Sequence, residues 1–374
     1  MPEPANHPTS DLLKWPSTAL LRWYDVHARD LPWRILPKAA KAGVTPDPYR
    51  IWLSEIMLQQ TNVTTVRPYY EKFLTLFPNV QALAAAPDTQ VMAAWAGLGY
   101  YSRARNLLKC ARTLVADYDG VFPNTEAALL SLPGIGPYTA AAIAAIAFNQ
   151  PAAPVDGNIE RVLSRLYKLQ TPMPALKAHV KQANAKLVPK DRPGDFAQAM
   201  MDLGATLCTP KRPNCLLCPW REPCLARQAG IEETLPIRAP KKPKPARQGV
   251  VFWLENAKGH VLMARRPDKG LLGGMLVFPS KGWDAPNESR LPELLPADAQ
   301  DQWTPLRGEV VHVFTHFKLT LSIRAQTAPK GFRAPQGFQW VAPQDFAREA
   351  LPSVMTKIWK AVLLKSVDRK ETGK

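Results

Sequence analysis

The sequence predicts two folded parts of different class, an all-α part up to about residue 235 and a separate α+β domain from about residue 249. Before residue 233 apolar residues recur at helical spacing with little sign of strands, and after residue 249 short alternating segments take over. Between them, residues 238–247 (RAPKKPKPAR) hold five basic residues, three prolines and no acid, a composition that makes a semi-extended linker. We therefore expect domains at 11–235 and 249–374, joined by a basic linker at 236–248.

In the first part, residues 1–10 are predicted to be disordered, and residues 11–28 carry apolar positions at helical spacing. Residues 37–48 are predicted as a loop and residues 48–61 as a helix, with further amphipathic helices to about residue 169.

The stretch 132–156 (LPGIGPYTAAAIAAIAFNQPAAPVD) begins with a glycine turn and continues into a helix. Pro137 suits the first helical turn, where the missing N–H would be unbonded anyway. Gly134 and Gly136 let backbone N–H groups approach an anion at a helix N-terminus. Residues 125–132 have the spacing of a short preceding helix, so we expect helix, hairpin, helix. Such a turn alone is weak evidence of a binding site.

The net charge makes nucleic acid the expected partner. The 374 residues carry a formal charge of +17, which favours a polyanion. The chain has no apolar run long enough to span a bilayer and no signal-peptide pattern at its start. We expect a monomer in the bacterial cytoplasm, associated with the nucleoid.

Four of the five cysteines, Cys208, Cys215, Cys218 and Cys224, have the spacing C-x6-C-x2-C-x5-C. This clustering indicates a bound metal or cluster in a reducing compartment rather than disulfides. Zinc and iron–sulfur clusters both accept four cysteine ligands. Structural zinc usually has two separated C-x-x-C pairs and here there is one, which favours [4Fe–4S]. Cys110 lies on an apolar helical stretch and is predicted as a small core residue.

Glu55 lies on an apolar stripe of the predicted 48–61 helix, because Ile51, Glu55 and Leu58 fall at i, i+4 and i+7. Burial of an unpaired carboxyl raises its pKa, which would make Glu55 a general acid near neutral pH. The spacing is equally compatible with a Glu paired to a buried arginine such as Arg34.

Asp156 precedes Gly157, Asn158 and a predicted helix, a position typical of an N-cap. An aspartate held there by backbone N–H groups could also stabilise a positive charge that develops on a substrate. One protonated and one charged carboxyl group are the arrangement expected for cleaving a bond to a sugar.

Two loops carry amide and aromatic side chains near basic residues, 59–61 (QQT) and 98–103 (LGYYSR). Such side chains can fill the gap when a base leaves the stack, although aromatic residues more often belong to a core.

In the second part, residues 249–255 and 261–266 flank Asn256-Ala257-Lys258-Gly259 and predict a β-hairpin. Residues 275–278, 310–314 and 318–324 are predicted as strands, and residues 353–364 as a helix.

Taken together, several motifs resemble the helix-hairpin-helix DNA glycosylases, and within them the MutY-type adenine DNA glycosylases. The matching segments are LPWR (31–34), WLSEIMLQQT (52–61), GLGYYSRARNL (97–107), LPGIGPYTAAAI (132–143), VDGN (155–158), QAMMDLGA (198–205), the cysteines and FTHF (314–317). The resemblance implies a six-helix barrel with a [4Fe–4S]-containing helical domain and a C-terminal Nudix-like domain. It also implies removal of adenine mispaired with 8-oxoguanine or guanine in double-stranded DNA.

By position, the resemblance implies a role for each matching residue. Glu55 would protonate N7 of adenine, and Asp156, oriented by Asn158, would stabilise the oxocarbenium-like sugar that Tyr138 lines. The flipped adenine would be enclosed by Trp33, Arg34, Leu58 and Asp202. The gap and the 8-oxoguanine would be contacted by Gln60, Thr61, Leu98 and Tyr100, and by the hydroxyl of Thr315.

Tyr138 distinguishes this chain from the related glycosylase-lyases, which carry a nucleophilic lysine at this position. We therefore expect a monofunctional hydrolase, with a glycosylase-lyase or a non-catalytic DNA-binding protein as the alternatives. The chain departs from the family at the longer 35–46 loop, at Thr315 where serine is usual, and in lacking a catalytic Nudix box.

Overall fold

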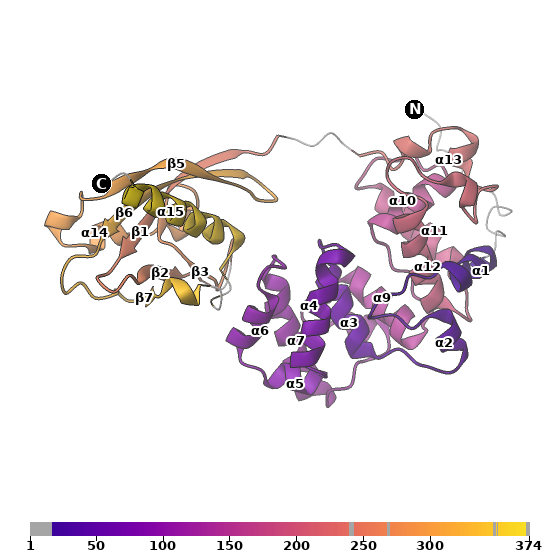
Figure 1. Cartoon of the computed structure of the whole chain (residues 1–374). Coiled ribbons are helices and arrows are strands. Elements are labelled where there is room, and N and C mark those ends of the chain that lie inside the picture. Colours follow the sequence, from indigo (N-terminus) through magenta and orange to yellow (C-terminus); the bar gives the residue numbers. More distant parts are fainter. Residues whose placement is uncertain (1–16, 239–242, 268–269, 347–348, 350, 372–374) are drawn as a thin grey trace. The chain divides into compact units, whose positions relative to one another are not determined.

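The computed structural model describes residues 17–238, 243–267, 270–346, 349 and 351–371 (Figure 1). They divide into two compact units, one formed by the described residues up to 86 together with 106–238, and the other by residues 87–105 together with the described residues from 243 onward. The predicted disordered segment 1–10 and part of the predicted linker lie outside the described residues. None of the described helices is long and apolar enough to cross a membrane.

The described residues before 239 are helical and hold no strand, which confirms the all-α prediction for that part. The helices are α1 (Ser17–His27), α2 (Pro37–Lys41), α3 (Pro48–Leu58), α4 (Val63–Leu76), α5 (Val80–Ala85), α6 (Asp88–Trp95), α7 (Ser102–Tyr118), α8 (Glu126–Leu130), α9 (Pro137–Phe148), α10 (Gly157–Leu166), α11 (Leu176–Leu187), α12 (Pro193–Thr206) and α13 (Leu225–Gln228).

Two of the predicted boundaries are wrong. The predicted 37–48 loop begins with α2, because Pro37 fits the first helical turn, where its fixed φ and missing N–H cost nothing. The predicted 48–61 helix ends at Leu58, since Gln59 leaves the helical conformation and Gln60 has a φ of 57°. At the other end of α3 the N-cap is Asp47, whose side chain accepts from the backbone N–H of Tyr49 at 2.9 Å.

The helix–hairpin–helix prediction is confirmed by α8, a turn and α9. Thr125 caps α8 by accepting from the N–H of Ala128, and Pro137 starts α9. Gly134 in the turn has a φ of 77°, and a Cβ there would lie 2.6 Å from Cβ of Asn106, so only glycine fits. Side chains of α9 are buried on all sides from Thr139 to Ile146, against α3, α8 and α12.

A second helical core forms where α10 packs against α11 and α12, and α1 against α12 (Figure 1). Its members include Tyr24, Leu163 and Met200, all fully buried. The core therefore fixes α10, the helix that begins directly after Asp156.

The C-terminal domain is built on one mixed sheet with the strand order β3-β2-β1-β6-β5, in which β4 pairs with β1 and β7 with β2. Only β1 and β6 run parallel among the described pairs. The strands are β1 (Ala246–Glu255), β2 (Val261–Arg265), β3 (Leu276–Val277), β4 (Ser280–Lys281), β5 (Thr304–Val313), β6 (Lys318–Thr327) and β7 (Phe338–Val341), with helices α14 (Leu291–Leu294) and α15 (Ser353–Glu371).

Alternation along β1 separates the two faces of this sheet. Val251 and Trp253 belong to a core shared with α15 (Figure 1), and Phe252 and Leu254 to a smaller core under α14. The predicted hairpin is confirmed, with Glu255 of β1 opposite Val261 of β2. β1 begins at Ala246, so the last three residues of the predicted linker belong to the strand. The predicted class, mainly α followed by α+β, is confirmed.

Candidate active site

Glu55 lies in the middle of α3 and is only 6% exposed. Burial raises the pKa of this carboxyl to about 7, against a hydrogen bond from the Tyr138 side chain and the charge of Arg34, which lower it. The nearby charge of Asp156 acts in the same direction as burial. At neutral pH a large fraction of Glu55 is therefore protonated, as a general acid requires.

Asp156 is the N-cap of α10, as the sequence predicts. Its Oδ1 accepts from the backbone N–H of Ile159 at 2.7 Å, and its Oδ2 from Nδ2 of Asn158 at 2.8 Å. Asn158 is held in turn by Arg161, whose NH2 donates to Asn158 Oδ1 at 2.8 Å. These bonds fix the direction of a carboxylate at the start of the helix.

Gly204 of α12 allows this close packing around Asn158. A Cβ at residue 204 would lie 2.6 Å from Cβ and 3.1 Å from Cα of Asn158. The glycine therefore lets α12 approach the first turn of α10.

Tyr138 connects the two carboxyl groups. It lies in the first turn of α9 and hydrogen-bonds the Glu55 side chain, and the negative charge of Asp156 raises its pKa. Burial raises the pKa of Tyr138 well above its usual value, so it remains a neutral donor. Glu55, Tyr138 and Asp156, from three different helices, thus form one interacting group.

Arg34 pairs with Asp202 rather than with Glu55. NH1 of Arg34 donates to Asp202 Oδ2 at 2.6 Å, and Arg29 donates to the same carboxylate through its Nε at 2.5 Å and its backbone N–H at 3.0 Å. Asp202 is fully buried, so this paired carboxylate holds Arg34 in place. Electrostatically, Arg34 is close enough to Glu55 to lower its pKa.

The other residues predicted to surround adenine flank α3. Trp33 is buried, with its ring 5.2 Å from that of Tyr70, and Leu58 is the last residue of α3. Gln60 and Thr61 follow in the turn, where the N–H of Thr61 donates to Leu58 O at 3.2 Å. Gly134 and Gly136, the predicted phosphate contacts, form the hairpin before α9.

Leu98, Tyr100 and Thr315 belong to the second unit. The hydroxyls of Tyr100 and Thr315 lie 3.2 Å apart, which joins two segments that are distant in the sequence. Tyr100 is 46% exposed and has a φ of 47°, whereas Leu98 is buried. The guanidinium of Arg103 donates to Leu98 O at 3.2 Å and lies 5.6 Å from the Tyr100 ring centre, so it stabilises this loop.

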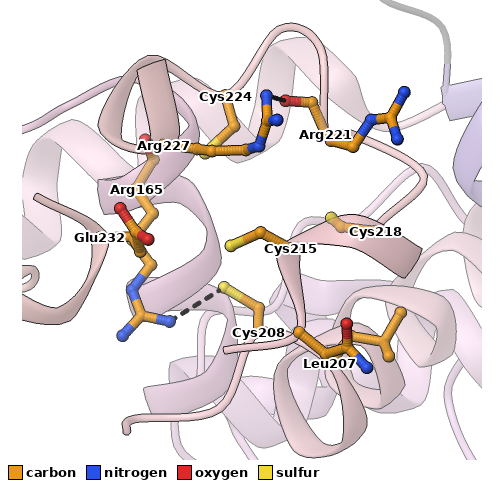
Figure 2. Close-up of a pocket in the computed structure, with 10 residues that line it drawn as sticks. Arg165, Leu207, Cys208, Cys215, Cys218, Arg221, Cys224, Arg227 and Glu232 are labelled. Carbon is orange, nitrogen blue, oxygen red and sulfur yellow. Dashed lines mark hydrogen bonds between the residues drawn. The ribbon is translucent and has the colours of Figure 1, made fainter. Parts of the chain in front are cut away.

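The four clustered cysteines line one cavity (Figure 2), and none of them forms a disulfide. Burial, assisted by the neighbouring sulfurs and opposed by a backbone hydrogen bond from Trp220, raises the pKa of the Cys218 thiol to about 12. Four such sulfurs can all be thiolates only with a cation between them. Cys110 is fully buried elsewhere, as predicted.

The spacing of these sulfurs bears on the choice between zinc and a cluster. Within the described part of the chain, no three His, Cys, Asp or Glu side chains converge closely enough to hold one metal ion. A zinc ion, with Zn–S bonds of about 2.3 Å, would need such convergence, whereas a polynuclear cluster keeps its ligands farther apart. Arg165, Arg221 and Arg227 also line the cavity with one carboxylate, Glu232, so its wall suits an anionic thiolate-ligated group.

Sequence patterns missed Arg29, Arg161 and Arg165. Both arginines of α10 are buried, with Arg161 6% and Arg165 1% exposed. Their i, i+4 spacing was the available signal, and it does not distinguish a buried pair from an exposed one. For Arg29 the sequence gives no signal, because its partner Asp202 lies on a distant helix.

Both parts of the chain match known protein families. The family described as HhH-GPD superfamily base excision DNA repair protein matches residues 53–190, and the NUDIX domain matches residues 250–361. Among solved structures, a thermostable thymine-DNA glycosylase is 29% identical with a TM-score of 0.52, covering 60% of this chain and 100% of that chain.

Curated relatives match over nearly the whole chain. The adenine DNA glycosylase of Mus musculus is 37% identical over 396 residues, covering 91% of this chain and 76% of that protein. The adenine DNA glycosylase of Homo sapiens is 37% identical over 404 residues, covering 91% of this chain and 73% of that protein. Identity at this level, over both the helical and the sheet-containing parts, shows that the chain belongs to the adenine DNA glycosylase family of base excision repair enzymes.

Proposed function

We propose that this protein removes adenine mispaired with 8-oxoguanine or guanine in double-stranded DNA, by hydrolysis and without cutting the strand. The observation that carries the proposal is the interaction of Glu55 with Asp156 through Tyr138, because it pairs a protonated carboxyl with a fixed carboxylate. That pairing is the chemistry needed to cleave a glycosidic bond.

In the first step, the protonated Glu55 carboxyl donates its proton to N7 of adenine, which makes the base a better leaving group. The bond between C1′ and N9 then breaks, and its electron pair leaves with the base. Positive charge develops on the sugar, where the Asp156 carboxylate stabilises it. Asn158 and the N–H of Ile159 hold this carboxylate in position, so little reorganisation is needed.

In the second step, water adds to C1′ and Glu55, now a carboxylate, takes the proton from that water. The product is free adenine and an abasic site, and Glu55 is protonated again. Tyr138 cannot form a Schiff base with the sugar, which is the reason to expect an intact strand.

Recognition of the opposite base is assigned to the second unit. Thr315 and Tyr100 are joined through their hydroxyls, and Tyr100 is half-exposed on its loop. A hydroxyl that can both donate and accept suits an oxidised purine. Thr315 has one methyl group more than the serine that is usual in the family. Replacing Thr315 by serine would therefore test how closely this loop fits 8-oxoguanine.

We further propose that Cys208, Cys215, Cys218 and Cys224 hold a [4Fe–4S] cluster. Their common cavity, their mutual electrostatic coupling and the arginines of its wall support this assignment. When bound, the cluster supplies the cation that stabilises four thiolates and thereby closes the 208–224 segment.

The test is to incubate the protein with duplexes that carry adenine opposite 8-oxoguanine, guanine or thymine, and one with an oxidised pyrimidine. We expect adenine loss opposite 8-oxoguanine and guanine, with strand breaks only after alkali. Breaks without alkali would identify a glycosylase-lyase, and equal excision opposite thymine would remove the mispair specificity. Retention of every base would leave only a DNA-binding protein.

A further inference from the structure

Arg165 of α10 is the most deeply buried cation beside the cysteine cavity, with 1% of its surface exposed. Each of its side-chain nitrogens donates a hydrogen bond: Nε to Leu235 O at 3.2 Å, NH2 to Pro210 O at 3.1 Å, and NH1 to Thr209 O at 2.7 Å. NH1 also lies 3.3 Å from Sγ of Cys208 (Figure 2).

This set of acceptors is unusual for a buried guanidinium. Among the described residues its hydrogen bonds go to neutral carbonyl oxygens and to one sulfur, and none goes to a carboxylate. A buried cation without an anionic partner is costly. The Cys208 sulfur supplies the missing negative charge once it is a thiolate ligand.

The carbonyl partners show why the guanidinium stays beside this sulfur. Thr209 and Pro210 directly follow the first cysteine of the segment, and Leu235 lies beyond the last one, Cys224. Arg165 therefore joins the entry and the exit of the cysteine segment to α10. Three carbonyl contacts fix the orientation of its planar fork, so the N–H beside Cys208 cannot turn away without breaking them.

We propose that Arg165 donates a hydrogen bond to the Cys208 thiolate of the bound cluster and thereby raises its reduction potential. The inference rests on the cluster proposed above. An N–H group that points at a thiolate ligand withdraws electron density from the sulfur, which favours the state of the cluster that holds one more electron. Burial strengthens the effect, because water is excluded from this side of the cavity.

Arg227 provides a matched control on the same cavity wall. Its NH1 donates to Arg221 O at 3.3 Å, and no described hydrogen bond joins its side chain to a cysteine sulfur. Its backbone N–H does bond the Cys224 sulfur, and Arg227→Gln leaves that bond in place. Arg227→Gln removes the same formal charge from the same cavity. The comparison therefore separates the hydrogen bond from the general electrostatic field.

The experiment first measures iron and acid-labile sulfide in the unchanged protein, and then the midpoint potential of its cluster. Arg165→Gln is expected to increase the ratio of oxidised to reduced cluster, at a fixed applied potential, by about tenfold. For a one-electron couple this corresponds to a midpoint potential lowered by about 59 mV. Arg227→Gln should shift it clearly less. Resonance Raman spectra should show a stiffer iron–cysteine stretch in Arg165→Gln alone.

The results distinguish a failure of the proposed cofactor from a failure of the proposed role of Arg165. Absence of iron and sulfide from the unchanged protein would overturn the proposed cofactor, whereas equal shifts in the two variants, or none, would overturn only the role of Arg165. If Arg165→Gln assembles no cluster, Arg165→Lys takes its place. A lysine keeps the charge but cannot donate hydrogen bonds to the sulfur and to three carbonyl oxygens together. The midpoint potential of the cluster in Arg165→Lys should therefore still fall, and an unchanged potential would contradict the inference.

Discussion

Helices α3 and α10 each contribute one carboxyl group to the same site, from opposite kinds of position. Glu55 projects from the middle of α3, where every backbone N–H is already bonded to the preceding turn. Asp156 precedes the first turn of α10, where N–H groups have no helical partner. The backbone thus offers a donor, the N–H of Ile159, to Asp156 and none to Glu55.

This difference is enough to separate the roles of two similar side chains. Burial without backbone donors raises the pKa of Glu55 to about 7 and keeps a proton available. Asp156 accepts one hydrogen bond from the backbone N–H of Ile159 and one from the side chain of Asn158, and both suit a carboxylate. The position of a carboxyl group along its helix therefore determines which half of the reaction it can serve.

The largest effect is expected from Glu55→Gln, which keeps the shape of the side chain and removes the proton. Single-turnover adenine release should fall by roughly 10²–10⁴-fold, the usual contribution of a general acid–base group. Binding of the mispaired duplex should persist, because burial of a neutral amide keeps the pocket intact. Near-normal turnover in this variant would contradict the acid role.

Asp156→Asn should have the next largest effect. It removes the negative charge opposite the developing positive charge and places an amide donor against Asn158 Nδ2. We expect a loss of about 10²–10³-fold in the chemical step, as for removal of one electrostatic group. Asp195→Asn is the control, since Asp195 is a half-buried carboxylate that pairs with Arg192 at the start of α12, and the rate of this variant should stay unchanged.

Gly204→Ala tests whether the close packing of α12 against Asn158 is needed to hold Asp156 at the start of α10. The added methyl would meet Asn158 at 2.6 Å, so α12 or the first turn of α10 must shift. We expect about 1–3 kcal/mol of lost stability from this overpacking and a slower chemical step. Gly157→Ala, where an added Cβ meets nothing within 4 Å, should change neither the melting temperature nor the rate much. Equal behaviour of the two variants would show that the packing does not matter.

The smallest effect is the pH dependence of the unchanged enzyme. With a pKa of about 7 for Glu55, the protonated fraction falls from about nine tenths at pH 6 to about one half at pH 7. The single-turnover rate should therefore drop roughly twofold over this interval and continue to fall at higher pH. A flat profile from pH 6 to 8 would place the pKa elsewhere, and Glu55→Gln should lack this titration.

The local signals in the sequence identified much of the fold. Glycine, proline and the apolar run of 137–148 predicted the hairpin and α9, because these residues restrict the backbone by themselves. The turn residues Asn256–Gly259 between two apolar segments predicted the β1–β2 pair for the same reason. Helix ends were less well predicted. The end of α3 depends on Gln59 and Gln60, which have no strong preference for leaving a helix.

The sequence by itself determined that Asp156 caps a helix and that four cysteines share a short segment, since both depend on neighbours along the chain. It left open whether Glu55 pairs with Arg34. Tertiary structure decided this by placing Asp202, from α12, beside Arg34 and Arg29. It also buried Arg161 and Arg165 of α10, whose partners Cys208 and Thr209 lie far away in the sequence. The physical reason is that a charge chooses its partner by distance in space, and helices brought together by their apolar faces set those distances.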